Sequence, residues 1–271
     1  MPRSNPLHPG TLAAARAAIL PLALASLAAC TAPEEGADGA VPEIVTTTYA
    51  PQNRPDVRGT VGAVSAGHPL AAQAGLAVLK DGGTATDAII AMAGVLAVTR
   101  PHMNGVGGDA FGIFYDGATG EVTALNASGR SGALATPDFF TAAGHDAVPQ
   151  TGPLSVSVPG AVAGWVDAHE RFGSRPFAEL LAPAIRFARD GFPVSTRLAL
   201  DFEAQGGDLN EYGRALYLPN DGAPPEVGTI LRNPELAASI ETIARRGKAG
   251  YYNGDIGRKL AAFVEAQGGH L

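Results

Sequence analysis

Apolar residues recur at a helical interval soon after the first sixty positions. Ala72, Leu76 and Leu79 keep the i, i+4, i+7 spacing of one helix face. Pro69 suits the first turn of such a helix, and Asp81-Gly82-Gly83 is typical of a helix end. The pattern therefore predicts a helix that starts near Pro69 and stops at this acidic glycine pair.

A second helix should follow directly, and its pattern differs from that of the first. Thr84 and Asp87 have the spacing of a capping box, with Asp in the place that Glu usually takes. From Ala88 to Val98 the residues are apolar on every face. A helix without a polar side is expected to lie inside its domain.

Four segments have the composition of β-strands. Residues 111–115 and 122–125 flank the turn-rich segment 116–120, which predicts an antiparallel hairpin. Residues 60–66 are small and β-prone, so we predict a strand buried on both faces. Residues 154–158 are predicted as a further strand, which a Pro-Gly pair ends.

The remaining apolar stripes predict helices. Four stripes keep this spacing: Val162, Trp165, Val166 and His169; Phe177, Leu180, Leu181 and Ile185; Leu236, Ile240 and Ile243; Ile256, Leu260, Phe263 and Val264. Helices and a hairpin in one segment indicate an α+β domain over residues 59–271. Periodicity alone supports no narrower class.

The amino terminus is typical of a bacterial targeting signal. Arg3 and Arg16 are basic, residues 17–29 are apolar, and Leu27-Ala28-Ala29-Cys30 matches a lipobox. We predict a lipoprotein signal peptide over residues 1–29, lipidation of Cys30, and attachment to a membrane at the periplasmic or cell surface. The alternative is an ordinary secretion signal with a chance cysteine. Residues 30–58 are rich in Pro, Thr and acids, which predicts a flexible tether.

Composition narrows the possible chemistry. The net charge is −7 and the basic residues do not cluster, which disfavours nucleic acid as a partner. Cys30 is the only cysteine, so no internal disulfide is possible. The histidines lack metal-ligand spacing, and His169 on an apolar face is expected to be a hydrogen-bonded core residue. We predict neither a metal nor another cofactor.

Several motifs occur in a fixed order along residues 58–271. They are Gly67-His68-Pro69, Gly82-Gly83-Thr84-Ala85-Thr86-Asp87-Ala88, Gly105-Val106-Gly107-Gly108-Asp109-Ala110-Phe111, Val158-Pro159-Gly160-Ala161-Val162-Ala163-Gly164, Ala182-Pro183-Ala184-Ile185-Arg186, Asp190-Gly191-Phe192-Pro193, Tyr251-Tyr252-Asn253-Gly254 and Gly268-Gly269. Together they resemble the large subunit of the γ-glutamyltransferase family. The resemblance implies an αββα sandwich of the N-terminal-nucleophile hydrolase type, here incomplete because the small subunit is absent. It also implies self-cleavage, with the nucleophilic threonine beyond Leu271 and the small subunit as a partner.

The same resemblance marks Arg130 as the substrate-binding residue. Gly129-Arg130-Ser131-Gly132-Ala133 matches the family's arginine, which holds the α-carboxylate of the γ-glutamyl donor. A guanidinium can meet a carboxylate with two parallel hydrogen bonds, which lysine cannot do. A solvated loop arginine is the alternative. Asp109 is a candidate for orienting Arg130 or for capping its own turn.

The glycine run over residues 104–109 allows two interpretations. A phosphate loop is disfavoured, because the run lacks both the Lys-Ser/Thr ending and the G-x-G-x-x-G spacing. We expect instead that its glycines serve a positive φ or close strand packing.

The substrate stays open among three functions. Glutathione-cleaving members usually carry Arg-Glu-x-Ala-Pro, whereas this chain has Arg130-Ser131-Gly132-Ala133-Leu134. Its Asn126-Ala127-Ser128-Gly129-Arg130 segment resembles a side branch that includes amidases of other small acids. The leading prediction is γ-glutamyl amide hydrolysis and transpeptidation. The alternatives are an amidohydrolase of another small amide acid, oxamate-like or acylase-like, and a non-catalytic, lipid-anchored protein that binds small acids.

Overall fold

A computed structural model of the protein describes residues 57–271. The predicted signal peptide, Cys30 and most of the predicted tether lie outside the described residues. The first two predicted helices are confirmed as α1 (Pro69–Lys80) and α2 (Ala85–Thr99). Pro69 occupies the first turn of α1, and the His68 ring accepts a hydrogen bond from the Leu70 amide at 3.2 Å.

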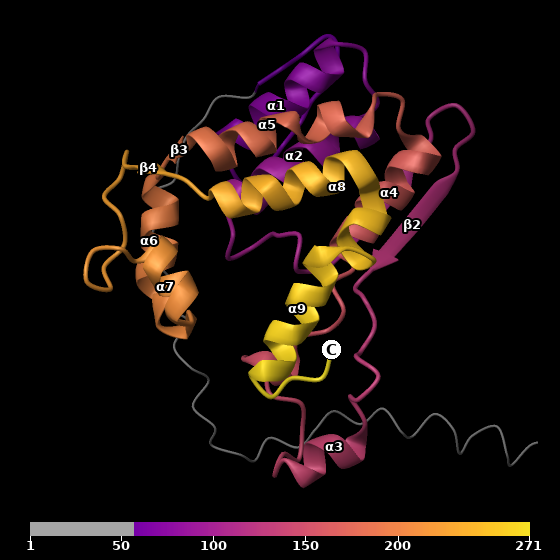
Figure 1. The fold of residues 1–271 in the computed structure, drawn as a ribbon. Coiled ribbons are helices and arrows are strands. Elements are labelled where there is room, and N and C mark those ends of the chain that lie inside the picture. Colours follow the sequence, from indigo (N-terminus) through magenta and orange to yellow (C-terminus); the bar gives the residue numbers. More distant parts are fainter. Residues whose placement is uncertain (1–56) are drawn as a thin grey trace, which may run out of the picture. The chain divides into compact units, whose positions relative to one another are not determined.

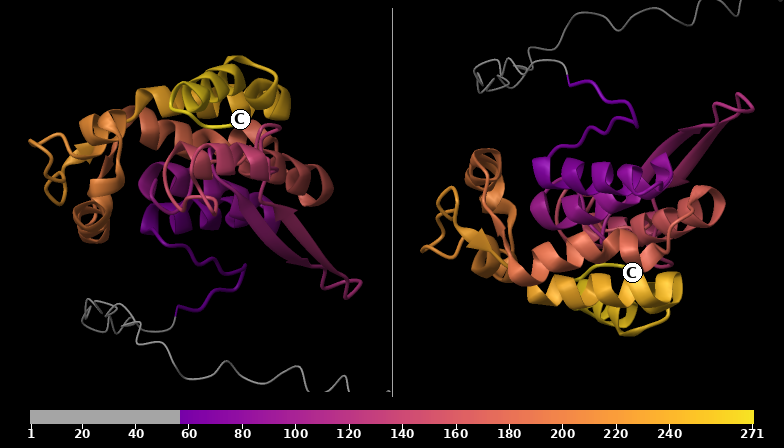
Figure 2. Two further views of the ribbon diagram at one scale, coloured as in Figure 1. Left: turned by 90° about the horizontal axis from the view of Figure 1, so that it is seen from below. Right: turned by 90° about the horizontal axis from the view of Figure 1, so that it is seen from above.

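Helix α2 lies inside the domain, as its apolar pattern predicts. Its capping box is complete, because Thr84 and Asp87 each accept a hydrogen bond from the other's backbone amide. Most of its side chains are buried, although Ile89 is 52% exposed. Helices α1, α2, α5 (Phe177–Asp190) and α8 (Pro234–Tyr252) pack in succession (Figure 2). The core therefore lies between parallel layers of helices.

The predicted hairpin is confirmed as β1 (Ala110–Tyr115) and β2 (Val122–Ala127). The two strands pair antiparallel, with Ala110 opposite Ala127 and Tyr115 opposite Val122. One face of the hairpin packs on α4 (Ala161–Phe172), which also contacts α2 and α8 (Figure 1). The hairpin's open end thereby comes to lie beside the start of α4.

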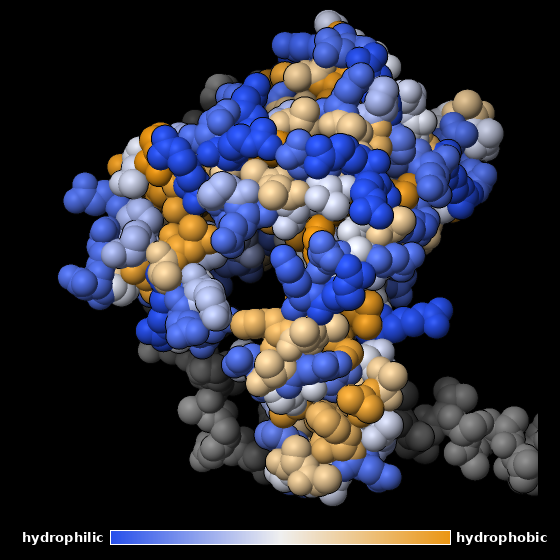
Figure 3. All heavy atoms as spheres, viewed as in Figure 1, coloured by the Kyte–Doolittle hydropathy of each residue, from blue (hydrophilic) through white to orange (hydrophobic). Residues whose placement is uncertain are grey.

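The remaining elements extend this helical body. Helix α9 (Asp255–Ala266) follows α8, and three shorter helices are α3 (Pro137–Ala142), α6 (Thr196–Gln205) and α7 (Glu211–Tyr217). Short 3₁₀ turns cover Pro153–Ser155 and Gly206–Asp208, and strands β3 (Phe192–Pro193) and β4 (Ile230–Leu231) form a small second sheet. Apolar side chains gather around α3 and α9 on the face shown in Figure 3. Phe263, in α9, is 41% exposed.

Two predicted strands are wrong. Residues 60–66 form an irregular and largely exposed segment, not a strand buried on both faces. Residues 154–158 continue from the 3₁₀ turn into irregular backbone. Neither segment has a partner strand among residues 57–271, and β-propensity reflects the fit to such a partner more than an intrinsic backbone preference.

Candidate functional site

Three backbone segments meet at the open end of the hairpin, and we call this meeting point the glycine junction (residues 108, 127–130 and 158–161). The Gly108 carbonyl accepts hydrogen bonds from the Gly160 and Ala161 amides, both at 3.0 Å. The Val158 amide donates to the Arg130 carbonyl at 2.8 Å. Residues far apart in the sequence are thus joined through main-chain atoms.

Glycine is required at two positions of the junction. A Cβ on Gly129 would lie 1.8 Å from the Val158 carbonyl oxygen, and Gly129 also has a φ of +82°. A Cβ on Gly160 would lie 2.2 Å from the Ala127 carbonyl oxygen. Real Cβ atoms never approach backbone so closely, so any side chain at these two positions would separate the segments.

The run over residues 104–109 contributes to the junction in an unexpected way. None of Gly105, Gly107 and Gly108 has a positive φ, and an added Cβ would meet nothing closer than 3.9 Å. The expected need for positive φ or close strand packing is therefore wrong. The run contributes the Gly108 carbonyl instead, which serves as an acceptor for the first amides of α4.

A local turn delivers Arg130 to the junction. The Asn126 side chain accepts a hydrogen bond from the Ser128 amide at 3.0 Å, which turns the chain away from β2. Gly129 then takes its left-handed conformation, and Arg130 follows. The position of Arg130 is therefore set by its own backbone.

Arg130 itself is exposed and chemically available. Within residues 57–271 its guanidinium has no hydrogen bond or ion pair, so all its donors can face a ligand. Asp109 is also exposed and also lacks a partner in that range. No hydrogen bond or ion pair joins the two side chains. Asp109 instead borders a cavity of about 380 Å³ that the glycine run and His102 also line.

Two tyrosines at the end of α8 donate hydrogen bonds to backbone carbonyls at or near the junction. The sequence alone assigned them no role. The Tyr251 hydroxyl donates to the Val106 carbonyl at 2.7 Å. The Tyr252 hydroxyl donates to the Pro159 carbonyl at 2.7 Å and accepts from the Ala163 amide at 3.1 Å. The adjacent pair Tyr251-Tyr252 was visible in the sequence, but nothing there indicates which carbonyls its hydroxyls meet.

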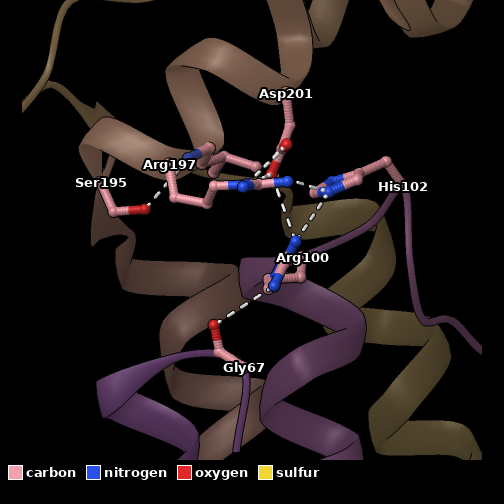
Figure 4. Close-up of polar contacts among 7 residues, drawn as sticks. Gly67, Arg100, His102, Ser195, Arg197 and Asp201 are labelled. Carbon is pink, nitrogen blue, oxygen red and sulfur yellow. Dashed lines mark hydrogen bonds and ion pairs between the residues drawn. The ribbon is translucent and has the colours of Figure 1, made fainter. Parts of the chain in front are cut away.

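A second polar cluster includes His102, which lines that cavity, and lies where α2 ends against α6 (Figure 4). The buried Asp201 carboxylate accepts from Arg197 at 2.8 Å, His102 at 3.0 Å and Arg100 at 3.2 Å. Burial lowers the pKa of His102, and the Arg100 charge adds to this effect against the opposing pull of Asp201. The charged side chains of this cluster are thus paired with one another.

The histidine predictions can also be located. The His169 ring lies 2.7 Å from the Arg175 carbonyl and is half-buried, as expected of a hydrogen-bonded core residue. Among residues 57–271, no three His, Cys, Asp or Glu side chains are arranged to bind a metal ion. In the same part of the chain, no helix combines the length and apolarity needed to cross a membrane.

Comparison with known proteins shows which proteins the chain is similar to. A family model described as Gamma-glutamyltranspeptidase matches residues 71–271. The glutathione hydrolase proenzyme of Bacillus subtilis is 35% identical over 218 residues, which cover 79% of this chain and 37% of that protein. The oxamate amidohydrolase proenzyme of Klebsiella pneumoniae is 37% identical over 216 residues, covering 77% of this chain and 40% of that protein.

The solved structures agree with this result. The γ-glutamyltranspeptidase of Helicobacter pylori superposes with a TM-score of 0.74 at 27% identity, covering 79% of this chain and 63% of that one. The chain spans about two fifths of the length of the two proenzymes it matches. The similarity therefore covers one contiguous part of a longer type of protein.

Proposed function

The chain belongs to the γ-glutamyltranspeptidase family, and we propose that it is the substrate-binding, large-subunit part of an amide-cleaving enzyme. Its α+β fold is that of the family's N-terminal-nucleophile hydrolases. The single observation that carries the proposal is the state of Arg130: an unpaired guanidinium on a backbone that the glycine junction fixes.

In the proposed reaction, the nucleophile comes from the protein's own small subunit. Self-cleavage would free a threonine whose α-amine takes the hydroxyl proton while the oxygen attacks the amide carbonyl carbon. The carbon–nitrogen bond then breaks, and the amine leaves with that proton. Water or an acceptor amine resolves the resulting ester. Arg130 orients the substrate's carboxylate and takes no part in bond breaking.

The outer face of the hairpin supports a small-subunit partner. Phe111, Ile113 and Tyr115 are 66%, 80% and 70% exposed there, although all three are large and apolar. An isolated two-stranded hairpin is at best marginally stable in water. We propose that strands of the small subunit cover this face and complete the sheet.

A second candidate substrate is a small amide acid other than a γ-glutamyl compound. The segment after Arg130 is tightly packed, because a Cβ on Gly132 would lie 1.9 Å from the His270 carbonyl oxygen. Glu, which usually follows the arginine in glutathione-cleaving members, is replaced by Ser131 here. The similarity to an oxamate amidohydrolase favours the same candidate.

We further propose that Cys30 carries a lipid that holds the protein at the periplasmic or cell surface. The proposal rests on the basic start, the short apolar segment and the Leu27-Ala28-Ala29-Cys30 sequence. Palmitate labelling in a bacterial host should disappear in Cys30→Ser. Equal labelling of the parent and the variant would contradict it.

The enzymatic proposal is tested by comparing the full-length protein with the 271-residue chain. The full-length protein should separate into two bands on a denaturing gel and should release product from γ-glutamyl-p-nitroanilide or from oxamate. The 271-residue chain alone should turn over neither compound. If the full-length protein binds small acids but neither cleaves itself nor any amide, the non-catalytic binding protein is the correct alternative.

A further inference from the structure

The hydroxyl of Tyr252 supplies a hydrogen-bond acceptor that the first turn of α4 lacks. The amides of a helix's first turn have no acceptors within the helix. Gly160, the residue before α4, has no side chain to supply one. The Gly108 carbonyl serves Gly160 and Ala161, and the Tyr252 hydroxyl serves Ala163. Tyr252 thus caps α4 from a different helix.

The same hydroxyl also holds the turn that precedes α4. It donates to the Pro159 carbonyl at 2.7 Å while it accepts from Ala163. One oxygen therefore joins the turn to the helix it leads into. Tyr252 is half-buried, and burial raises its pKa, so the hydroxyl keeps the proton that this arrangement needs.

From the turn, a short path of backbone contacts leads to Arg130. The residue before Pro159 is Val158, whose amide donates to the Arg130 carbonyl at 2.8 Å. Gly129 packs directly on the Val158 carbonyl, with no side chain between them. A shift of the turn would therefore be passed to Arg130 without a flexible side chain to absorb it.

Tyr251 holds a different segment from the one that Tyr252 holds. Its hydroxyl donates to the Val106 carbonyl at 2.7 Å, inside the glycine run that ends at Gly108. The two rings lie edge to face, with centroids 4.8 Å apart. Adjacent residues of one helix thus fix two of the three segments that meet at the junction.

We propose that Tyr252 is a positioning residue for substrate binding: its hydroxyl fixes the turn on which the backbone of Arg130 is anchored. The inference rests on the proposed function of Arg130 as the carboxylate-binding residue. It goes further by assigning a role to a side chain that touches no substrate.

The test uses the full-length enzyme and a pair of substrates, an amide acid and its analogue with the acid replaced by a carboxamide. Tyr252→Phe keeps the ring and removes the oxygen. Its kcat/KM on the acid should fall about 3- to 15-fold, because the hydrogen bonds of the hydroxyl with Pro159 and Ala163 are lost, and its kcat/KM on the carboxamide should change less than about twofold. In an Arg130→Lys background, Tyr252→Phe should add less than about twofold, because residues that act as a unit are not additive.

Tyr217→Phe is the matched control. Tyr217 lies in α7, is half-buried like Tyr252, and loses its hydrogen bond with Asn233 in this variant. This variant should leave the ratio of the two kcat/KM values unchanged. Amide hydrogen exchange at Val158, Gly160 and Ala163 should accelerate in Tyr252→Phe and not in Tyr217→Phe, which tests the contact independently of activity.

The outcomes separate the two proposals. Suppose that Arg130→Lys lowers the preference for the acid. If Tyr252→Phe then lowers kcat/KM equally on the acid and the carboxamide, or if its effect on kcat/KM adds in full to that of Arg130→Lys, the positioning role is overturned and the function of Arg130 stands. If Arg130→Lys leaves the acid preference unchanged, the site assignment fails and the positioning role fails with it. Unchanged exchange at Ala163 in Tyr252→Phe would also overturn the inference.

Discussion

Arg100 and Arg130 have the same side chain in opposite circumstances. Arg100 is 19% exposed and contacts Asp201, His102 and the Gly67 carbonyl (Figure 4). Arg130 is exposed, and within residues 57–271 its guanidinium makes no hydrogen bond or ion pair. The hydrogen-bond donors of Arg100 are used within the fold, whereas those of Arg130 are available to a ligand.

The two regions also differ in the atoms that hold them together. The Arg100 cluster is assembled by side chains from α6 and the segment after α2, over about a hundred residues of sequence separation. The glycine junction is assembled by main-chain atoms, with no side chain between its segments. A free charge on a fixed backbone suits substrate orientation, because the backbone then loses little entropy on binding.

The largest expected effect comes from a methyl group placed in the junction. Gly129→Ala combines a positive φ with a contact of 1.8 Å, so it should lower the free energy of unfolding by about 2–4 kcal/mol. Gly107→Ala is the matched control, since an added Cβ there meets nothing and φ is not positive. Urea denaturation compares the two. Equal free energies of unfolding for the two variants would show that the segments of the junction can move apart without loss of stability.

Asp201→Asn should come next in size and should affect stability alone. It removes the charge of a buried carboxylate that Arg100, His102 and Arg197 contact, and losing a hydrogen bond to a charged group costs about 1.5–3 kcal/mol. Because the cluster is separate from the glycine junction, the variant's preference for an acid over its carboxamide should stay within about twofold of the parent's. A large loss of that preference would show that the two regions are coupled.

The smallest expected effect concerns pH. Burial lowers the pKa of His102 below its usual value of 6.5, so below that pH the unfolded chain binds a proton more readily than the folded chain. His102 therefore contributes a loss of stability as the pH falls from 6.5 towards its folded pKa. In His102→Gln, the slope of unfolding free energy against pH should be shallower between pH 6.5 and 5. An unchanged slope would contradict the assigned titration.

Local patterns predicted the parts of this fold that depend on local physics. The capping box at Thr84 and Asp87, the proline at the start of α1 and the turn between β1 and β2 all act within a few residues. The two wrong strands, at residues 60–66 and 154–158, depend on partners that the sequence does not specify.

The site, too, has features that the sequence predicts and features that only the folded chain shows. Arg130 was marked by its motif, but its lack of partners is a property of the folded chain. The pairing of His102 with Asp201 joins residues nearly a hundred positions apart, and no single-sequence pattern encodes it. The contact of Tyr252 with Pro159 is equally distant in sequence. Such contacts follow from helix packing and are visible only in the structure.

The most direct test of the central claim is Arg130→Lys in the full-length protein. Lysine keeps the charge but loses the planar fork, so kcat/KM for acid-bearing amides should fall about 10- to 150-fold. Self-cleavage needs only chemistry at the new threonine, so the subunit bands should be unchanged. A kcat/KM within about twofold of the parent's for every acid-bearing amide, or a block of self-cleavage, would mean that Arg130 is not the residue that holds the substrate's carboxylate.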